Sequence, residues 1–275
     1  GKNFKNLMIR RGINTSGLQQ DNLRPTRVVL VRRDSLGERF FEGFEGDKDL
    51  GFADQAISRE QIIRDWPLVV EQAKWLVAGT IPLASERSSE AFLWCIENAL
   101  QAGIKIVLDL NWRPTFWRNK VSTALEPSKK EKNQIFSILK NVSLIKLAKE
   151  EAKWFFNTSD PTEISSSLAH RPSVVVTDGS NPILWRINNH TGKSFAITPS
   201  SVVDTTGAGD AFTAGLLYKL ISFELDQISQ QIAEDIIQFG IASGSYVCKG
   251  VGAIDSQPYL EDIENLLSVS KGGIS

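Results

Sequence analysis

The sequence predicts an α/β fold, in which helices flank a mostly parallel sheet and a hairpin projects from the core as a small lid. First, short apolar runs alternate with longer segments of helical period, as in strand–helix–strand units. Second, apolar and polar residues alternate on both sides of a turn near the start of the chain. Third, the sequence has no repeats, low-complexity tracts or linkers rich in Pro, Gly and Ser, which favours an undivided core.

The parallel strands are assigned to four short apolar runs. They lie at residues 74–78, 104–110, 143–147 and 173–177. Between the first two, an amphipathic helical pattern covers residues 85–102 and ends at Gly103, a usual residue after a helix. Further helices are predicted at residues 211–222, 226–247 and 258–267.

Two hairpins are predicted. The first combines apolar residues 28–31 with Phe40, Phe41 and Phe44 around a turn at residues 34–37. In the second, strands at residues 183–187 and 194–197 are joined by a turn at residues 188–192, which includes His190. We predict two regions: residues 1–54, which include the lid hairpin at about residues 26–46, and an α/β core over residues 55–275.

The composition is that of a soluble globular protein. A chain of 275 residues with 41% hydrophobic residues can bury a substantial core. Its 31 basic and 32 acidic residues are well mixed, so we expect no nucleic-acid partner and no membrane partner. Cys95 and Cys248 are far apart and form no CxxC pair, which favours reduced thiols. We expect a cytoplasmic protein, and a plastid stroma stays open because a transit peptide could precede Gly1.

A glycine motif marks the predicted site. Residues 202–203 end an extended segment, Gly207, Ala208 and Gly209 form a flexible turn, and a helix follows. Amides at a helix N-terminus bind anions, because they have no intrahelical partner and the helix dipole adds positive charge. Asp210 lies beside this anion site, where a carboxylate can accept the proton of a hydroxyl that attacks a phosphoryl group. The alternative is that Asp210 only caps the helix and the glycines only form a turn.

Two other phosphate-binding motifs are excluded by the residues. The pattern GxxxxGK[ST] of Walker-type nucleotide sites does not occur. The two glycines are followed by Phe212 where a dinucleotide-binding fingerprint has its third small residue. No acidic residue closes a second strand at the expected distance, so a dehydrogenase is disfavoured.

The run DTTGAGDAF at residues 204–212, followed by Ala214 and Gly215, resembles the C-terminal signature of the ribokinase-like (PfkB) carbohydrate kinases. This resemblance implies a ribokinase-like three-layer αβα core and transfer of the ATP γ-phosphoryl group to a sugar hydroxyl. Asp210 would be the base on that hydroxyl and would contact the sugar. The amides of residues 207–210 would form the anion hole for the phosphoryl group, with Gly207 and Gly209 next to the nucleotide.

The resemblance also implies metal ions. The family binds a monovalent cation, here expected to be K⁺, beside the glycine loop. Its ligands would be the carboxylate of Asp204, the carbonyl of Thr206, and oxygens of Val247, Gly250, Gly252 and Ser256. Mg²⁺ would accompany the ATP.

Two further segments resemble nucleotide-binding elements of the family. The run KLAKEE at residues 146–151 is similar to the family's N-x-x-E or S-x-x-E element, with Glu151 at the glutamate that orders hydrated magnesium and with Ala148 in place of the polar residue. Taken alone, Glu151 could equally be an exposed complement to a helix dipole. Thr177 and Gly179 match the T-x-G nucleotide contact. Gly240 departs from the Asn or His that the family usually offers near adenine.

The predicted sugar-binding residues lie after a strand, in the run DLNWRPTFW at residues 109–117. This run resembles the D-x-N-x-R-x-x-x-W segment of fructokinases, which implies that Asp109, Asn111 and Arg113 face the sugar; from the residues alone, a solvated loop is the alternative. Fructose is therefore the expected substrate. The alternatives are a 2-keto-3-deoxygluconate or other keto-sugar kinase, and a kinase-like scaffold or regulatory protein without turnover.

Residues 12–41 are similar to the lid region of the family, which implies a possible homodimer through the lid. The family's N-terminal strand and helix, with a substrate-binding aspartate and a Gly-Gly sugar loop, would precede Gly1 and are absent from this chain. The arginine that is common before the Ala53-Asp54 pair is also missing.

Overall fold

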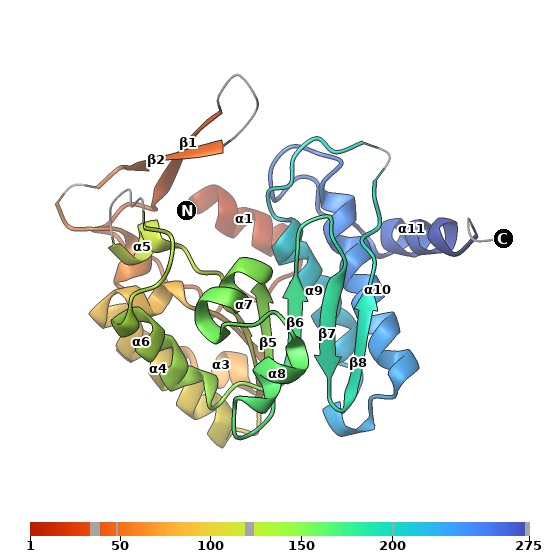
Figure 1. Cartoon of the computed structure of the whole chain (residues 1–275). Coiled ribbons are helices and arrows are strands. Elements are labelled where there is room, and N and C mark those ends of the chain that lie inside the picture. The colour runs from red at the N-terminus through yellow and green to blue at the C-terminus, as the bar shows by residue number, and fades with distance from the viewer. Residues whose placement is uncertain (34–38, 48, 119–123, 200, 273–275) are drawn as a thin grey trace. The chain divides into compact units, whose positions relative to one another are not determined.

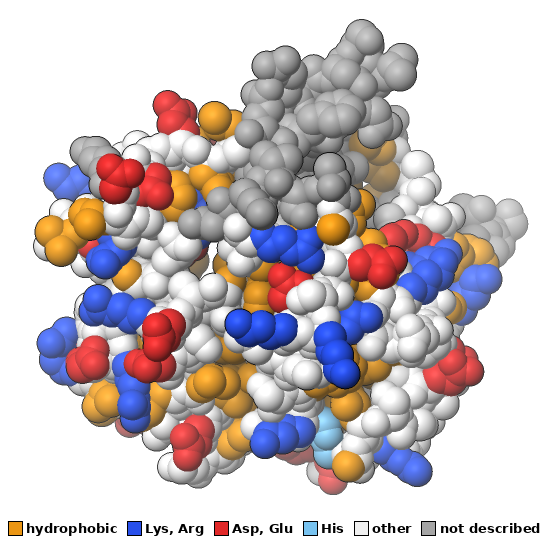
Figure 2. All heavy atoms as spheres, turned by 60° about the vertical axis from the view of Figure 1, so that its left-hand side comes forward, with side chains coloured by type: hydrophobic (Ala, Val, Ile, Leu, Met, Phe, Trp, Pro, Cys, Tyr) orange, Lys and Arg blue, Asp and Glu red, His pale blue; other side chains and the backbone are white. Residues whose placement is uncertain are grey.

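The computed structural model describes residues 1–33, 39–47, 49–118, 124–199 and 201–272. The chain forms two compact units, Gly1–Val142 and Ser143–Ser275, and each is described by itself. Within the described residues, no helix combines the length and the apolar character needed to cross a membrane. One face of the molecule carries basic and acidic side chains intermingled rather than segregated (Figure 2).

The first unit contains the lid hairpin and one parallel strand pair. Strands β1 and β2 form the hairpin (Figure 1). Strands β3 and β4 run parallel, and helix α4 packs against β4. The elements are α1 (Lys2–Arg10), β1 (Val28–Arg33), β2 (Arg39–Glu45), the 3₁₀ turn η1 (Ala53–Gln55), α2 (Arg59–Asp65), α3 (Pro67–Val70), β3 (Trp75–Gly79), the 3₁₀ turn η2 (Ile81–Ala84), α4 (Glu86–Gln101), β4 (Lys105–Asp109), α5 (Pro114–Arg118) and α6 (Lys129–Leu139).

The second unit contains a mixed sheet covered by helices. Strands β5 and β6 are parallel, and β7 and β8 continue the sheet antiparallel. Helices α9 and α10 pack against each other, and α10 also contacts β8 (Figure 1). The elements are β5 (Leu144–Ala148), α7 (Lys149–Phe156), α8 (Pro161–Ser166), β6 (Ser173–Thr177), β7 (Ile183–Ile187), β8 (His190–Ser194), α9 (Ala208–Leu220), the 3₁₀ turn η3 (Leu225–Gln227), α10 (Gln230–Val247) and α11 (Leu260–Gly272).

Most of the predicted elements are confirmed. The four parallel strands and the helix after the first of them have bounds within one residue of the prediction. Gly103 follows α4 with φ 71°, the left-handed conformation expected after a helix. The strands of the lid hairpin are also present, while its predicted turn at residues 34–37 lies outside the described residues. The predicted division at residue 54 stays a prediction.

The prediction for the second hairpin was wrong at its turn. Strand β8 begins at His190, which pairs with Ile187, so Asn188 and Asn189 alone form the turn, and residues 195–197 are not in the strand. The strand was missed because its residues are polar or small and show no apolar alternation. Its Gly192 lies under the ring of Trp185: a Cβ atom there would be 2.2 Å from Trp185 Cζ2. The tryptophan ring therefore covers the part of the strand that has no side chain.

Three helix bounds also differ from the prediction. Helix α9 begins at Ala208 instead of residue 211, so Ala208 and Gly209 are helical and not part of a flexible turn. Helix α10 begins at Gln230 instead of residue 226, and residues 225–227 form a 3₁₀ turn. The hydroxyl of Ser229 caps the helix by accepting a hydrogen bond from the amide of Ile232 at 3.3 Å. Helix α11 covers Leu260–Gly272, later than the predicted 258–267.

Glycines let α9 and α10 approach closely. A Cβ atom at Gly215 would lie 2.2 Å from the Ser243 hydroxyl, and one at Gly244 would lie 2.8 Å from the carbonyl oxygen of Ala208. A Cβ atom at Gly240 would lie 3.0 Å from the ring of Phe212. The glycine at position 240, where the family usually has Asn or His, thus has a packing reason: a larger side chain would push α9 away from α10.

Candidate functional site

Helix α9 begins at a position that only glycine can occupy. Gly207 has φ 84°, in the left-handed region that other residues rarely adopt. A Cβ atom at this position would also lie 2.6 Å from Cβ and 2.8 Å from Cα of Ala253. Both the backbone conformation and the neighbouring chain therefore require glycine, and this fixes the point at which the helix starts.

The first turn of α9 presents unpartnered amides. The amide of Ala208 donates to the carbonyl of Thr205 at 3.3 Å, and the amide of Ala211 donates to that of Gly207 at 2.9 Å. Between them, the amides of Gly209 and Asp210 donate to no acceptor within the described part of the chain. Two free N–H groups at the positive end of a helix dipole form a suitable place for an anion.

Asp210 lies in this same first turn with its side chain exposed. The helix is capped by Gly207 and receives no side-chain capping bond, so the alternative in which Asp210 serves as the cap does not hold. Among the described residues, its carboxylate has no hydrogen-bond or ion-pair partner. A carboxylate that is accessible, unpaired and adjacent to an anion site can accept a proton from a hydroxyl placed there.

The predicted cation ligands are connected through Asp204. Asp204 is 7% exposed. One of its oxygens accepts from the amide and the hydroxyl of Thr206, at 2.9 and 2.7 Å, and the other accepts from the amide of Gly252 at 3.1 Å. The carbonyl of Cys248 accepts from the amides of Val203 and Asp204 at 2.8 and 3.3 Å. These bonds join the segment before α9 to the loop after α10.

The remaining predicted cation ligands lie in that loop. The Ser256 hydroxyl donates to the Gly252 carbonyl at 2.8 Å, and the Gly250 amide donates to the Val247 carbonyl at 3.3 Å. Within the described residues, no group of three or more His, Cys, Asp and Glu side chains could hold a metal ion. The predicted set instead consists of one carboxylate together with backbone carbonyl and hydroxyl oxygens. Such donors fit a hard monovalent cation.

Glu151 differs from the exposed side chain that the sequence alternative described. It is 5% exposed, and its carboxylate accepts from the backbone amide of Ala148 at 2.7 Å. Thr177 ends the neighbouring strand in register with Ala148, and its hydroxyl donates to the carbonyl of Leu147 at 3.5 Å. Glu151 and Thr177 therefore lie at the carboxyl ends of two adjacent parallel strands, where α/β sheets commonly bind ligands.

An ion pair that the sequence analysis missed connects these two strand ends. The ammonium group of Lys149 lies 2.6 Å from a carboxylate oxygen of Asp178, next to Gly179. This hydrogen bond lowers the pKa of the Asp178 carboxyl and raises the pKa of the Lys149 ammonium group. Lys149 directly follows Ala148, and Asp178 directly follows Thr177, at the ends of the two predicted strands. The pair could have been predicted only with the register of β5 and β6, which places Ala148 opposite Thr177.

The predicted sugar-binding residues form one loop in the first unit. Asp109 ends β4, opposite Gly79 of β3. Leu110 and Trp112 are 0% and 2% exposed, whereas the intervening Asn111 has a left-handed φ of 43° and Arg113 is exposed. The Arg113 guanidinium donates to the carbonyl of Trp112 at 2.9 Å. The buried Leu110 and Trp112 thus hold the loop against the core, and the polar Asn111 and Arg113 alternate with them along the chain.

A second group in this unit is an aromatic cage around Arg27. Its guanidinium lies 4.4, 4.6 and 4.8 Å from the ring centres of Phe44, Phe52 and Phe116. It donates two hydrogen bonds, of 2.8 and 3.2 Å, to the carboxylate of Asp54. The Arg27 side chain is 6% exposed, and its remaining Nη1 has no hydrogen-bond partner among the described residues. The cage connects the lid strand β2 to helix α5, and the sequence analysis did not predict it.

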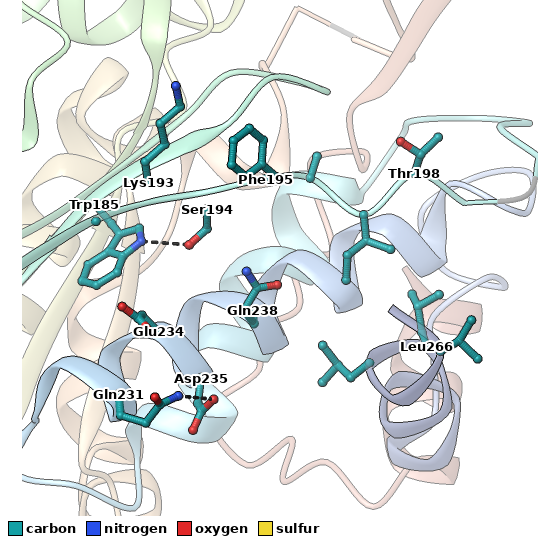
Figure 3. A pocket seen from close by; sticks show the side chains of 15 residues that line it. Trp185, Lys193, Ser194, Phe195, Thr198, Gln231, Glu234, Asp235, Gln238 and Leu266 are labelled. Atoms are coloured by element: carbon teal, nitrogen blue, oxygen red, sulfur yellow. Dashed lines mark hydrogen bonds between the residues drawn. The ribbon is translucent and has the colours of Figure 1, made fainter. Parts of the chain in front are cut away.

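Two cavities lie away from the predicted site. One of about 830 Å³ is lined by residues of β7, β8, α10 and α11. On one side, the Trp185 indole donates to the Ser194 hydroxyl at 3.0 Å, and on another Gln231 donates to Asp235 at 3.3 Å (Figure 3). A cavity of about 590 Å³ in the first unit is lined by residues between 17 and 24, residues between 53 and 62, and Arg87. Neither cavity is lined by a residue of the predicted site.

An αβ sheet with unpartnered amides in the first turn of α9 can bind an anion such as a phosphoryl group, and comparison with known proteins names the family. Residues 1–260 match the pfkB family carbohydrate kinases. The chain therefore belongs to the pfkB family of carbohydrate kinases.

The individual relatives have low sequence identity to this chain. The chain is 26% identical over 272 residues to the probable fructokinase-6, chloroplastic, of Arabidopsis thaliana, covering 97% of this chain and 66% of that protein. It is 26% identical over 263 residues to the fructokinase of Vibrio alginolyticus, covering 94% of this chain and 78% of that one. The chain thus spans about two thirds to four fifths of the length of these relatives.

Solved structures support the fold. A double mutant of the fructokinase from Vibrio cholerae O395, crystallised with fructose, ADP and potassium ion, has a TM-score of 0.77 at 21% identity. The match covers 97% of this chain and 80% of that one. The predicted ribokinase-like α/β fold is thereby confirmed.

Proposed function

We propose that the protein is an ATP-dependent sugar kinase in which Asp210 accepts the proton of the attacking sugar hydroxyl. The observation that carries this proposal is the first turn of α9, where an unpaired exposed carboxylate stands beside two amides without acceptors. The amides of Gly209 and Asp210 stabilise the charge on the transferring phosphoryl group. As the hydroxyl oxygen bonds to phosphorus, the bond to ADP breaks and the proton passes to Asp210.

Metal ions are part of this proposal. When bound, Mg²⁺ neutralises charge on the ATP phosphates, and Glu151 holds the water around it. The carboxylate of Glu151 accepts a hydrogen bond from the Ala148 amide, which orients it at the end of β5. A potassium ion is proposed beside Asp204, because the loop of Gly250, Gly252 and Ser256 supplies further oxygens. The Vibrio cholerae fructokinase double mutant, which was crystallised with fructose, ADP and potassium ion, supports the potassium ion in this proposal.

Fructose is the proposed sugar, contacted by Asp109, Asn111 and Arg113. The relatives described as fructokinases support this choice, as does the alternation that leaves polar residues of the loop outside the buried Leu110 and Trp112. The planar guanidinium of Arg113 can donate to two oxygens at once. Homodimer formation through the lid and a cytoplasmic location are proposed on the family resemblance alone.

The first test is Asp210→Asn, measured by ATP consumption with a panel of sugars in the presence and absence of potassium. Loss of a general base should lower kcat by about 10²–10⁴-fold while the variant stays folded. Asp226→Asn is the matched control, because Asp226 is also exposed and lies in the same unit outside the site. A variant that keeps the wild-type rate would remove Asp210 from this role. Wild-type protein that consumes ATP with none of the sugars would favour the scaffold alternative.

A further inference from the structure

Arg27 is held in one orientation, although it directly precedes the lid strand β1. Its guanidinium donates two hydrogen bonds to the carboxylate of Asp54, and the Arg27 side chain is 6% exposed. The backbone of Asp54 is fixed in turn, because the buried hydroxyl of Ser88 on α4 donates to its carbonyl at 2.7 Å. A planar guanidinium that is bound at two points cannot turn without breaking both hydrogen bonds. Arg27 is thus joined to the helical core of the first unit.

The Phe116 ring connects this fixed guanidinium to the proposed sugar loop at residues 109–113. The centre of the ring lies 4.8 Å from the Arg27 guanidinium and 4.9 Å from the ring centre of Phe44, which it meets edge to face. Phe116 belongs to α5, which directly follows the loop. Its backbone amide donates to the carbonyl of Arg113 at 3.0 Å, and the amide of Trp117 donates to the same carbonyl at 3.3 Å. The backbone of Phe116 and that of Arg113 are therefore coupled.

Helix α5 is too short to keep its place without tertiary contacts. It has five residues, whereas isolated helices shorter than about 12–15 residues are only marginally stable in water. Its far end is anchored separately, because Arg118 pairs with Glu131 of α6 at 3.2 Å. At the near end, which joins the sugar loop, the Phe116 ring packs in the cage of Arg27. The position of the Arg113 backbone therefore depends on the cage.

We propose that Arg27 is a positioning residue for sugar binding: the cage holds Phe116, and Phe116 holds the loop from which Arg113 donates to the sugar. This role rests on the proposed sugar kinase function and assigns the alignment of its sugar contact to one buried residue. Hydrogen bonds weaken steeply when the donor is misaligned, so the planar fork of Arg113 needs a fixed backbone. Arg27 acts through Phe116, needs no contact of its own with the sugar, and takes no part in phosphoryl transfer.

The test is steady-state kinetics of the full chain with fructose and ATP in the presence of Mg²⁺. Arg27→Met should raise the KM for fructose by about 10-fold, the loss expected for one hydrogen bond from a charged group. The kcat should change by less than about threefold and the KM for ATP by less than about twofold, because the lost interaction is binding shared by ground and transition states. Arg27→Lys keeps the charge but not the two-point contact, so its KM for fructose should lie between those of wild type and Arg27→Met.

Two controls separate positioning from the effects of charge and of stability. Arg24→Met removes an arginine of the same unit that pairs with Asp21 outside the cage. Ile96→Val removes a methyl group from a residue of α4 that is 2% exposed, so it lowers stability without changing the cage. Both variants should keep the KM for fructose within about twofold of the wild-type value. If Ile96→Val raises this KM as much as Arg27→Met does, loss of stability explains the effect and the proposal fails.

Arg113→Met shows whether the effect passes through the sugar loop. When Arg113 is already methionine, Arg27→Met should raise the KM for fructose by less than about twofold, because the group that it positions is gone. A further rise of about 10-fold in the double variant would mean that Arg27 acts on a different part of the site, and would overturn the proposal.

The outcomes separate this role from the proposed function. If the wild type phosphorylates fructose and folded Arg27→Met has the same KM, the proposed function stands and Arg27 has no positioning role. If Arg27→Met does not fold, as judged by circular dichroism, Phe116→Leu decides, because it leaves the pair of Arg27 and Asp54 in place. A raised KM for fructose at unchanged kcat then supports the role, and an unchanged KM overturns it. Wild-type protein that does not phosphorylate fructose would contradict the proposed function and the role of Arg27 together.

Discussion

The proposed phosphate-binding region in the second unit and the proposed sugar-binding region in the first are built in different ways. The phosphate region, around the first turn of α9, uses backbone amides and carbonyls from two short segments, residues 204–210 and 247–256. The sugar region uses side chains on the loop at residues 109–113. The adjacent cage of Arg27 draws on the lid strand, η1 and α5.

The difference teaches how each region is specified. In the phosphate region, Gly207 sets the backbone direction and Asp204 fixes the neighbouring loop through Gly252. Few side chains are needed, so a short motif contains most of the information. In the cage, Arg27 and Phe116 are distant in sequence and meet only in the folded unit. Its geometry depends on side-chain packing, which a local pattern does not encode.

The largest effect is expected when the backbone of the phosphate region is changed. Gly207→Ala would combine a strained positive φ with contacts of 2.6 and 2.8 Å to Ala253. We expect a loss of about 3–5 kcal/mol in the free energy of unfolding, since strain and overpacking each cost about 1–3 kcal/mol. Urea denaturation measures this loss, and calorimetry with ADP measures the accompanying loss of nucleotide binding.

Gly103→Ala is the matched control for that change. Gly103 has a similar φ of 71°, but a Cβ atom there would meet nothing within 4 Å. This variant should lose only about 1 kcal/mol, the cost of the left-handed conformation alone. Equal losses for the two variants would mean that the contact with Ala253 contributes nothing, and that the start of α9 is less tightly fixed than described.

Local patterns in the sequence were enough for much of the fold and for the glycine motif. Apolar runs and helical periodicity gave the parallel strands, and Gly103 gave the end of α4, because these signals are local. Strand β8 was missed because its residues are polar or small and show no apolar alternation, and the packing of its Gly192 against Trp185 of the neighbouring strand is not visible in the sequence. The start of α9 was placed three residues late, since glycine and alanine at residues 207–209 were interpreted as a flexible turn instead of a cap and a first helical turn.

The sequence did not predict those parts of the site in which side chains from different elements meet. The pair of Lys149 and Asp178 depends on the register of β5 and β6. The sequence analysis assigned no role to Arg27, although it noted that the arginine common before the Ala53-Asp54 pair is missing. In the structure, it is Arg27 that pairs with Asp54.

A smaller effect is expected from the cage. Arg27→Met would remove the partner of Asp54 and the cation above three aromatic rings. Removing one member of a buried ion pair costs about 3–5 kcal/mol, and we expect about 2–3 kcal/mol because the Asp54 side chain is 38% exposed and can be hydrated. Arg27→Lys keeps the charge but loses the planar two-point contact, so it should recover only part of this loss.

Urea denaturation is again the measurement, with Arg24→Met as the control. Arg24 pairs with Asp21 at 3.1 Å, but its side chain is 25% exposed and lies in no aromatic cage. The control should lose less than about 1 kcal/mol. Affinity for ADP should stay at the wild-type value in Arg27→Met, because the phosphate region belongs to the other unit. A loss of ADP binding in the folded variant would break the distinction between the two regions.

The smallest effect is expected for the one side-chain pair at the strand ends of the phosphate region. The hydrogen bond from Lys149 holds the pKa of Asp178 below 3.8 and the pKa of Lys149 above 10.5. The stability due to Asp178 is therefore present above pH 3.8 and is lost as the pH falls through its lower folded pKa, while that due to Lys149 is lost only above pH 10.5.

Between about pH 5 and 9, thermal melting should give a small, constant difference between wild type and Asp178→Asn, which vanishes at strongly acidic pH. Asp226→Asn, which removes an exposed carboxylate that forms no ion pair with the residues the structure describes, is the control for this difference. A large difference in melting temperature between wild type and Asp178→Asn at pH 7 would mean that the phosphate region, like the cage, depends on side-chain pairing. The glycine motif alone would then not be enough to specify the geometry of this region.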